Sequence, residues 1–213
     1  MKILTELQQK VLNVLFADEL IKRHFYLTGG TALSVFYLEH RYSDDLDLFT
    51  HNIDISSIDR VVKDLIVNAG FSIETERSSA AYRRFRVDKS LQLDLVCDVD
   101  FRVGAPDLID GIMVDTPKNL AVNKVLAIYG RLDPKDYVDL YFLFKKEKFN
   151  ILELLSLAQK KDAGIEPFMW SRVIMDAESL SILPRMIAPV DLKKIKSFFH
   201  KLRDEILDKV KPA

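Results

Sequence analysis

Helical and strand-like spacings of apolar residues alternate along the first half of the chain. Across residues 4–22 the apolar residues recur at helical spacing, which predicts a first amphipathic helix. The stretch "FYLTGG" is typical of a short strand that runs into a glycine turn, and "TALSVFYLEH" predicts a second helix with Thr31 as its N-cap. The stretch "SDDLDLFT" alternates with a period of two, so we expect a strand there.

One more helix and a hairpin follow before the pattern changes. "SIDRVVKDLIVNAGF" predicts a helix that is closed by Gly70, just past its end. "YRRFRVD" and "LQLDLVCDV" both alternate and are joined by "KS", which predicts a β-hairpin. From about residue 116 onward the spacing is helical: Thr116 suits an N-cap, Pro117 suits a first helical position, and three further helical segments follow.

These elements predict an α+β fold. We expect a small mixed sheet flanked by helices over residues 1–115 and a helical C-terminal part over residues 116–213. The sequence contains no internal repeat, low-complexity tract or flexible linker, so we expect the helical part to pack on the core.

Composition and charge narrow the class of protein. With 48% hydrophobic and 30% charged residues, the 213-residue chain has the composition of a globular protein, and its 7 glycines and 7 prolines favour helices over an all-β sandwich. The net charge of -1 attracts neither nucleic acid nor anionic membrane, so a polyanion would need a local basic patch. Cys97 is the only cysteine and cannot form an internal disulfide, and no signal peptide or membrane-spanning stretch is visible. We therefore expect a cytoplasmic protein without a membrane partner.

Acidic residues on two of the predicted strands suggest a metal site. On the first, Leu46 and Leu48 face the core, so Asp45 and Asp47 share the other face with Cα atoms about 7 Å apart. On the second, the same alternation places Asp94 opposite the leucines, and it joins the other two if the strands are neighbours. Clustered carboxylates repel each other without a cation, and an all-oxygen ligand set suits Mg²⁺ or Mn²⁺.

Exposed aspartates on an outer strand face are the alternative interpretation, and the glycine pair bears on it. Gly29 and Gly30 come between a predicted strand and a predicted helix, where backbone N–H groups can cradle an anion. A glycine turn before a helix is common and is a weak signal alone. A phosphate cradle followed by clustered carboxylates is less common, so the combination favours a site for a nucleotide and metal ions that assist phosphoryl transfer.

Two blocks of the sequence resemble a known family. "GGTALSVFYLEHRYSDDLDLF" resembles the signature of AbiEii/AbiGii-type nucleotidyltransferases, which include toxins of bacterial abortive-infection and toxin–antitoxin systems and belong to the polymerase-β-like superfamily. The matching positions are Gly29, Gly30, His40, Arg41, Ser43, Asp45, Leu46, Asp47, Leu48 and Phe49. "PKNLAVNKVLAIYGRLDPKDYVDLYFL" resembles the helical segment of the family at Lys124, Arg131, Lys135, Asp136 and Asp139. The blocks cover about residues 21–144, and the last 70 residues carry no diagnostic match.

The resemblance implies a role for each matching residue. Asp45 and Asp47 would hold the catalytic Mg²⁺ or Mn²⁺, with Asp94 as third carboxylate and general base. The residues implied in nucleotide binding are Gly29, Gly30, Thr31, Arg41, Ser43 and Lys124. Asp136 is implied as a further catalytic residue beside Lys124. The helical part over residues 116–213 would complete the active site of the nucleotidyltransferase core.

Structural roles remain open for several of these residues. A single lysine on a helix, such as Lys124, is more often solvated than bound to a ligand. Asp136 and Asp139 share a helix face and could instead pair with Lys135 or Arg131 or cap their helix. His40 and Arg41 could tie the end of a helix to the next turn. Basic residues occur in "ERSSAAYRRFRVDK" and in the C-terminal helix, and they would suit a nucleic-acid backbone if they converged beside the carboxylates. No RNA-recognition motif is visible.

These observations predict a metal-dependent nucleotidyltransferase that moves a nucleoside monophosphate from an NTP to an acceptor hydroxyl and releases pyrophosphate. A tRNA or other RNA acceptor, a toxin role and a cognate antitoxin follow from the resemblance alone. A small-molecule or protein hydroxyl remains open, because the fold does not determine the acceptor. A non-catalytic nucleotide- or RNA-binding module with the same fold is the alternative from another class, and a metal-dependent phosphohydrolase is a weaker one.

Overall fold

The computed structural model describes residues 3–210, which form two compact units. The first unit holds the chain up to Tyr37 together with Ser43–Asp100 and Gly104–Thr116. The second holds Leu38–Tyr42, Phe101–Val103 and the chain from Pro117 onward. The expected packing of the helical part on the core stays a prediction.

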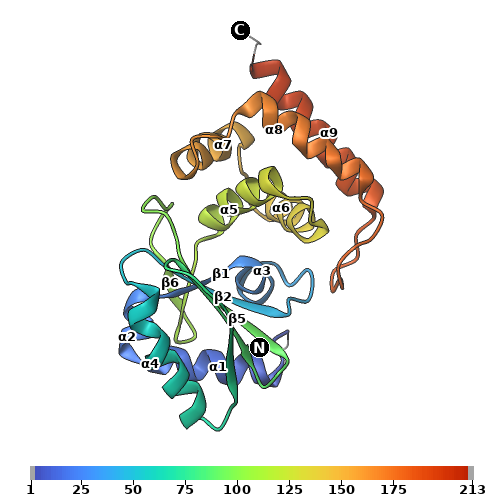
Figure 1. The fold of residues 1–213 in the computed structure, drawn as a ribbon. Helices are drawn as coiled ribbons and strands as arrows, with labels where there is room; N and C mark the ends of the chain where they lie inside the picture. The colour runs from blue at the N-terminus through green and yellow to red at the C-terminus, as the bar shows by residue number, and fades with distance from the viewer. Residues whose placement is uncertain (1–2, 211–213) are drawn as a thin grey trace. The chain divides into compact units, whose positions relative to one another are not determined.

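A mixed sheet forms the centre of the first unit (Figure 1). Its strands are β1 (Tyr26–Thr28), β2 (Asp45–Thr50), β3 (Ile73–Ser78), β4 (Tyr82–Val87), β5 (Leu91–Cys97), β6 (Asp107–Ile109) and β7 (Ile112–Val114). Among the described residues their order is β3-β4-β5-β2-β1-β7-β6. The pairs β2–β5 and β1–β7 are parallel and the remaining neighbours are antiparallel. This arrangement confirms the predicted α+β class with a small mixed sheet.

The first helical segment is not one helix, so the prediction of a helix over residues 4–22 was wrong. The structure has α1 (Glu6–Ala17) and α2 (Glu19–His24), separated by Asp18 in an extended conformation. The Asp18 carboxylate accepts the backbone N–H groups of Leu20 and Ile21 at 2.9 and 3.0 Å. Aspartate is a strong N-cap because it satisfies N–H groups that a new helix leaves free. The chain therefore starts a second helix at this residue.

The helix after the glycine turn begins earlier than predicted. It starts as α3 (Gly29–Ala32), with Thr28 at the N-cap position, and continues as a π-helix over Leu33–Leu38. Thr31 is thus inside α3 and fully buried, so its predicted N-cap role was wrong. The backbone of Gly29, with φ +70°, supplies the turn instead.

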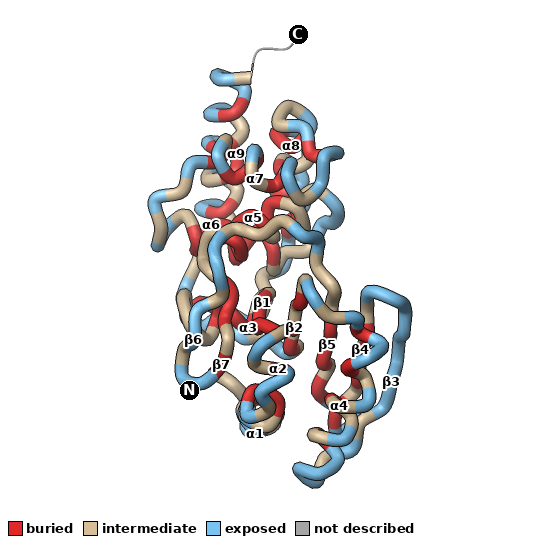
Figure 2. Tube along the Cα trace, turned by 90° about the vertical axis from the view of Figure 1, so that its left-hand side faces the viewer, coloured by how far each residue is buried: buried red, intermediate tan, exposed pale blue. Residues whose placement is uncertain are grey.

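The predicted phase of β2 is confirmed. Leu46 and Leu48 are fully buried, while Asp45 and Asp47 on the opposite face are half-buried. Figure 2 shows buried positions gathered on β1, β2 and β5. The helix α4 (Ile55–Asn68) packs against β3, β4 and β5 and ends as predicted at Gly70, which has φ +88°.

The sequence patterns missed three strands. β3 lies at one edge of the sheet, and five of its six residues are exposed, so it lacks an apolar alternation. The other two, β6 and β7, have only three residues each. Short or solvent-exposed edge strands bury too few side chains to leave a period-two pattern.

The second unit is helical, as predicted. Its helices are α5 (Pro117–Gly130), α6 (Pro134–Lys146), α7 (Ile151–Lys161), α8 (Pro167–Val173), the 3-10 helix Ile174–Ser179 and α9 (Leu192–Lys209). Trp170 is fully buried among them and donates its indole N–H to the backbone oxygen of Val125 at 3.0 Å. Within residues 3–210 no strand follows β7, and one isolated bridge joins Arg41 to Met186. No helix in this described range is long and apolar enough to cross a membrane.

The burial of β2 leads to a stability prediction. Leu48→Ala removes a fully buried side chain from a central strand and leaves a cavity, so we expect a loss of about 2–5 kcal/mol in the free energy of unfolding. Leu108→Ala is the matched control, because Leu108 lies on the edge strand β6 and is 57% exposed. We expect the control to stay within about 0.5 kcal/mol of the wild type. Urea unfolding measures both, and equal losses would contradict this account of the core.

Candidate functional site

The pairing of β2 with β5 brings the three predicted carboxylates to one face of the sheet. Asp47 lies opposite Asp94 in this parallel pair, and Asp45 lies opposite Gln92. Partners in register point to the same face, and residues two apart on a strand share a face. Asp45, Asp47 and Asp94 therefore occupy neighbouring positions on the face opposite the buried leucines, as the sequence suggested.

An arginine that the sequence did not link to this site binds Asp94. Arg84 on β4 donates from Nε to Asp94 Oδ1 at 2.9 Å and from Nη2 to Oδ2 at 2.8 Å. Gln92 donates to the same Oδ2 at 3.1 Å. This two-pronged contact is a strong, charge-assisted form of ion pair, and it raises the pKa of Arg84. Burial and the Asp94 charge also raise the pKa of the neighbouring Tyr82 to about 12.

The alternating pattern of "YRRFRVD" was a sequence feature that could have predicted the contact between Arg84 and Asp94. It places Arg84 and Arg86 on one face of β4, and the hairpin then aligns Arg84 with Asp94 and Arg86 with Gln92. Arg86 is itself bound to Glu76 at 2.8 and 3.0 Å. These arginines are thus neutralised by neighbouring acids, so the strand does not form the free basic surface that we had considered for a nucleic acid.

The glycine turn lies directly against Asp47. Thr28, which precedes the turn, is the partner of Asp47 in the antiparallel pair of β1 and β2. A Cβ atom on Gly29 would come within 2.2 Å of Asp47 Oδ2, and the φ of +70° also disfavours any other residue. Gly29 is therefore required both by its backbone conformation and by the space that the Asp47 carboxylate occupies.

Two hydroxyl groups fix the elements that carry this turn. Thr31 donates its Oγ1 hydrogen to the backbone oxygen of Asp45 at 2.5 Å, which ties α3 to the first residue of β2. Thr28 donates to Asp115 Oδ2 at 2.8 Å, and Asp115 is fully buried. Asp115 is not among the predicted site residues, although an acid directly after the apolar stretch "IMV" was a visible signal. Ser43 contributes its backbone oxygen, which accepts Gln8 Nε2 at 2.9 Å.

The donor set of this face suits a hard cation through Asp45 and Asp47. Their carboxylate oxygens are the ligands that Mg²⁺ and Mn²⁺ prefer, and the missing Cβ of Gly29 leaves room for the Asp47 carboxylate. Asp94 would have to share its oxygens with Arg84. In line with that pairing, no three His, Cys, Asp or Glu side chains in the described part of the chain are placed to hold a metal ion together.

The remaining predicted residues lie in the second unit, in a buried network of charges. Asp139 accepts Arg41 Nε at 2.6 Å, Arg41 Nη2 at 2.7 Å, His40 Nε2 at 2.7 Å and Lys124 Nζ at 2.8 Å. Asp136 accepts the same Lys124 ammonium at 2.7 Å and Arg131 Nε at 2.8 Å. The two carboxylates and His40 are fully buried, and both carboxylates are paired with cations inside the unit. His40 bonds through Nε2, while its buried Nδ1 has no hydrogen-bond partner among the described residues.

The network corrects the structural role that we had considered for Lys124. Lys124 is buried rather than solvated, although burial opposes its charged form. Asp139 and Asp136 outweigh that effect and raise the pKa of Lys124. Burial likewise opposes ionisation of Asp139, yet Lys124 and Arg41 hold its pKa well below the usual range. Asp136 pairs with Arg131 as one alternative foresaw, while Asp133 caps α6 by accepting the N–H of Lys135.

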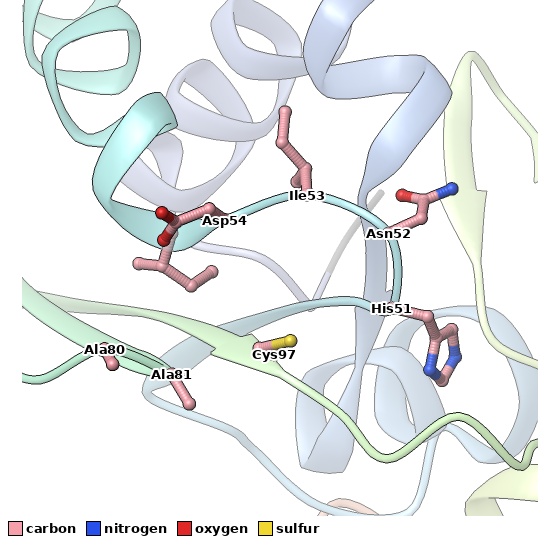
Figure 3. A pocket seen from close by; sticks show the side chains of 8 residues that line it. His51, Asn52, Ile53, Asp54, Ala80, Ala81 and Cys97 are labelled. Atoms are coloured by element: carbon pink, nitrogen blue, oxygen red, sulfur yellow. The ribbon is translucent and has the colours of Figure 1, made fainter.

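A separate hollow in the first unit contains none of the predicted residues (Figure 3). It measures about 500 Å³ and lies beyond the ends of β2 and β5, where Asp54 begins α4. Its polar side chains include His51, Asn52 and Asp54, and no lysine or arginine lines it. A triphosphate would gain little there, because the lining offers no fixed positive charge.

Comparison with known proteins places the chain in a family. Residues 10–210 match the family model described as "Nucleotidyl transferase AbiEii toxin, Type IV TA system". The uncharacterized protein aq_aa25 of Aquifex aeolicus (strain VF5) is 31% identical over 157 residues, which are 67% of this chain and 68% of that protein.

Solved structures share the fold. JHP933 from Helicobacter pylori is similar with a TM-score of 0.63 and 20% identity over 96% of this chain and 90% of that chain. Another H. pylori structure also gives a TM-score of 0.63, with 22% identity over 97% of both chains. At these identities the likeness concerns the fold.

The contact between Gly29 and Asp47 can be tested with two alanine substitutions. Gly29→Ala and Gly111→Ala both force a side chain into the left-handed region, which costs about 1–2 kcal/mol. A Cβ on Gly111 meets nothing within 4 Å, whereas one on Gly29 must displace the Asp47 carboxylate. We therefore expect both to lower stability in urea unfolding, but only Gly29→Ala to weaken Mg²⁺-dependent NTP binding, by about tenfold or more in calorimetry. Unchanged binding in Gly29→Ala would separate the turn from the site.

The buried network predicts a pH-dependent stability. Asp139→Asn leaves Arg41 and Lys124 without their shared carboxylate, so we expect a loss of about 3–5 kcal/mol at pH 7. The folded pKa of Asp139 lies below its unfolded value, so its contribution is present above about pH 4 and is lost as the pH falls toward the folded pKa. The gap between wild type and variant in urea unfolding should accordingly narrow below about pH 4. The exposed Asp208→Asn is the control and should show no such gap at any pH.

Proposed function

The chain belongs to the AbiEii family of nucleotidyl transferase toxins, and from that premise we propose that it moves a nucleoside monophosphate from an NTP to an acceptor hydroxyl, with release of pyrophosphate. The observation that carries the proposal is the contact between the Gly29 turn and the Asp47 carboxylate. A bare backbone turn suits phosphate oxygens, and a neighbouring carboxylate pair suits the cation that accompanies them. The Gly29 turn and the Asp47 carboxylate lie in contact in the first unit, which supports placing both halves of the proposed nucleotide site there.

The residues of the sheet face have separate roles in this proposal. Asp45 and Asp47 would hold Mg²⁺ or Mn²⁺, which when bound neutralises phosphate charge and stabilises the leaving pyrophosphate. The backbone N–H groups of Gly29 and Gly30 would bind the phosphates. Asp94 would accept the proton of the acceptor hydroxyl, and the Arg84 guanidinium fixes the orientation of that carboxylate.

Some of the predicted contacts have only the family resemblance as support. Thr31 and Ser43 contact the protein itself in this structure, so their part in nucleotide binding would be to position the turn and β2. Arg41, Lys124 and Asp136 belong to the charged network of the second unit, and their contact with a nucleotide stays a prediction. The network would keep Lys124 charged for such a contact, because its two carboxylates favour the ammonium form.

We propose RNA, and tRNA in particular, as the acceptor. The family description as a type IV toxin supports a toxic activity in the cell and a cognate antitoxin as partner. Transfer to an RNA that is needed for translation would account for toxicity, and the resemblance to the abortive-infection family points the same way.

One observation favours the non-catalytic alternative. Asp94 is bound by Arg84 and Gln92, and the described residues contain no group of three acidic or nitrogen ligands ready for a metal. A module that binds a nucleotide without turnover would retain such an arrangement. An active enzyme would need Asp94 to exchange at least one of these contacts when substrate binds.

The test uses Asp47→Asn and Asp44→Asn. Asp47 lies on the site face beside Gly29, whereas the exposed Asp44 precedes β2. The purified variants are incubated with Mg²⁺ or Mn²⁺, each α-³²P-labelled NTP and total bacterial RNA, and label and pyrophosphate are measured. We expect Asp47→Asn to lower transfer by about a hundredfold or more and Asp44→Asn to have a mild effect.

The product distinguishes the alternatives. Label in a tRNA-sized band identifies the acceptor class and the nucleotide. Pyrophosphate without labelled RNA points to a protein or small-molecule acceptor, and orthophosphate points to a phosphohydrolase. NTP binding without any product supports the non-catalytic module, and a fully active Asp47→Asn enzyme would falsify the metal assignment.

A further inference from the structure

A basic groove crosses the surface of the second unit between α6 and α9. It has a volume of about 390 Å³ and is lined by Tyr141, Lys193, Lys194, Ser197, Phe198 and Lys201. The lining thus combines three ammonium groups with two aromatic rings and a hydroxyl, and it contains no carboxylate. Lys145 adds a fourth ammonium at the α6 side, 5.8 Å from the centre of the Tyr141 ring.

The lysines of this groove are not neutralised by the fold. Lys193, Lys194 and Lys201 are exposed, and within residues 3–210 none of them forms an ion pair. The arginines of β4 behave differently, since Arg84 and Arg86 are paired with acids. The chain as a whole carries a net charge of -1, so the groove is a local concentration of positive charge on a nearly neutral protein.

The position of the lysines on α9 does not serve the stability of the helix. Lys193 and Lys194 lie in the first turn, where the positive end of the helix dipole disfavours cations. The nearest acid is the N-cap Asp191, whose carboxylate accepts the backbone N–H of Lys193 at 2.9 Å, and from Leu192 to Arg203 the helix contains no acidic residue. The helix is held instead by its opposite face, where Ile195, Phe199 and Leu202 are buried. An external anion would therefore meet ammonium groups that form no ion pair within the described residues.

We infer that this groove binds the phosphate backbone of an RNA. Seven residues separate Lys194 from Lys201, which corresponds to about 10 Å along a helix, so the ammonium groups can contact more than one phosphate. Lysines act as point charges on phosphates and read no sequence. Phe198 packs against Tyr141, Phe144 and Phe199 and is half-buried, so part of its ring offers an apolar surface to a base or ribose. An acidic protein segment would match the charge but would make less use of this surface. That this RNA is also the acceptor rests on the function proposed above.

The experiment measures RNA binding apart from catalysis. Fluorescence anisotropy with a labelled tRNA, in EDTA and without NTP, gives the affinity of the full chain over a range of salt concentrations. The test variant is Lys193→Ala/Lys194→Ala/Lys201→Ala, and the matched control is Lys10→Ala/Lys22→Ala/Lys160→Ala, which removes the same charge outside the groove. We expect the test variant to bind the tRNA at least about tenfold more weakly at low salt. The salt slope, which is the slope of the logarithm of the binding constant against the logarithm of the salt concentration, should become smaller in magnitude by about two to three. The control variant should keep the wild-type affinity and slope.

A single substitution and the melting temperature guard against a folding artefact. Lys194→Gln should lower the salt slope by about one. All variants should melt close to the wild type, because Lys22 is half-buried and the other replaced side chains are exposed. Wild-type affinity and slope in the triple variant would overturn the inference. Competition by poly-glutamate as strong as that of RNA, at equal charge and ionic strength, would overturn it too and would point to an acidic protein partner.

The binding and transfer assays fail independently. The wild type could bind an RNA through these lysines and yet never label it. That result would support the RNA-binding groove and reject RNA as the acceptor. If RNA is labelled but the triple variant binds it as tightly as the wild type, the proposed function is supported and RNA binding by the groove is rejected.

Discussion

The alternation along β2 is the constraint on which the candidate site depends. Two fully buried leucines fix the phase of this strand, because a shift by one residue would move both into solvent and two carboxylates into the core. The same phase places Asp45 and Asp47 on the face that carries Asp94. The neighbouring strand β1 then ends in the Gly29 turn, whose missing side chain leaves the space that Asp47 occupies. Core packing and candidate chemistry thus share one strand, and a shift in the register of β2 would change both.

The second unit depends on a different balance of forces. Two buried carboxylates are compensated there by Arg41, Lys124 and Arg131, with His40 as a further hydrogen-bond partner. Burial of such charges is unfavourable unless every partner is present, so the network tolerates little change. Since His40 and Arg41 come from a short segment far from α6 in the sequence, their contacts with Asp139 hold that segment in the helical unit. A family position can therefore be filled for reasons of folding as well as of catalysis.

Positive charges are used differently in the two units. All three arginines of β4 are bound to acids, so they leave no free basic surface on that strand. Lys193, Lys194 and Lys201 of α9 are exposed and line a basic groove. The net charge of -1 therefore combines a sheet face with three aspartates in one unit and a groove with three exposed lysines in the other.

Features that depend on local periodicity and backbone geometry could be predicted from the amino-acid sequence alone. The phase of β2, the hairpin of β4 and β5, the glycine turn, the end of α4 at Gly70 and the helical second half all follow from spacing and from glycine or proline chemistry. The pairing of polar groups, in contrast, depends on how distant elements pack. No local pattern specifies contacts between residues from different elements. Examples are the contact of Arg84 with Asp94, of Lys124 with two aspartates, and of Thr28 with the buried Asp115. Burial makes an unpaired charge costly, and the partner that satisfies it is chosen by the packing of distant strands and helices.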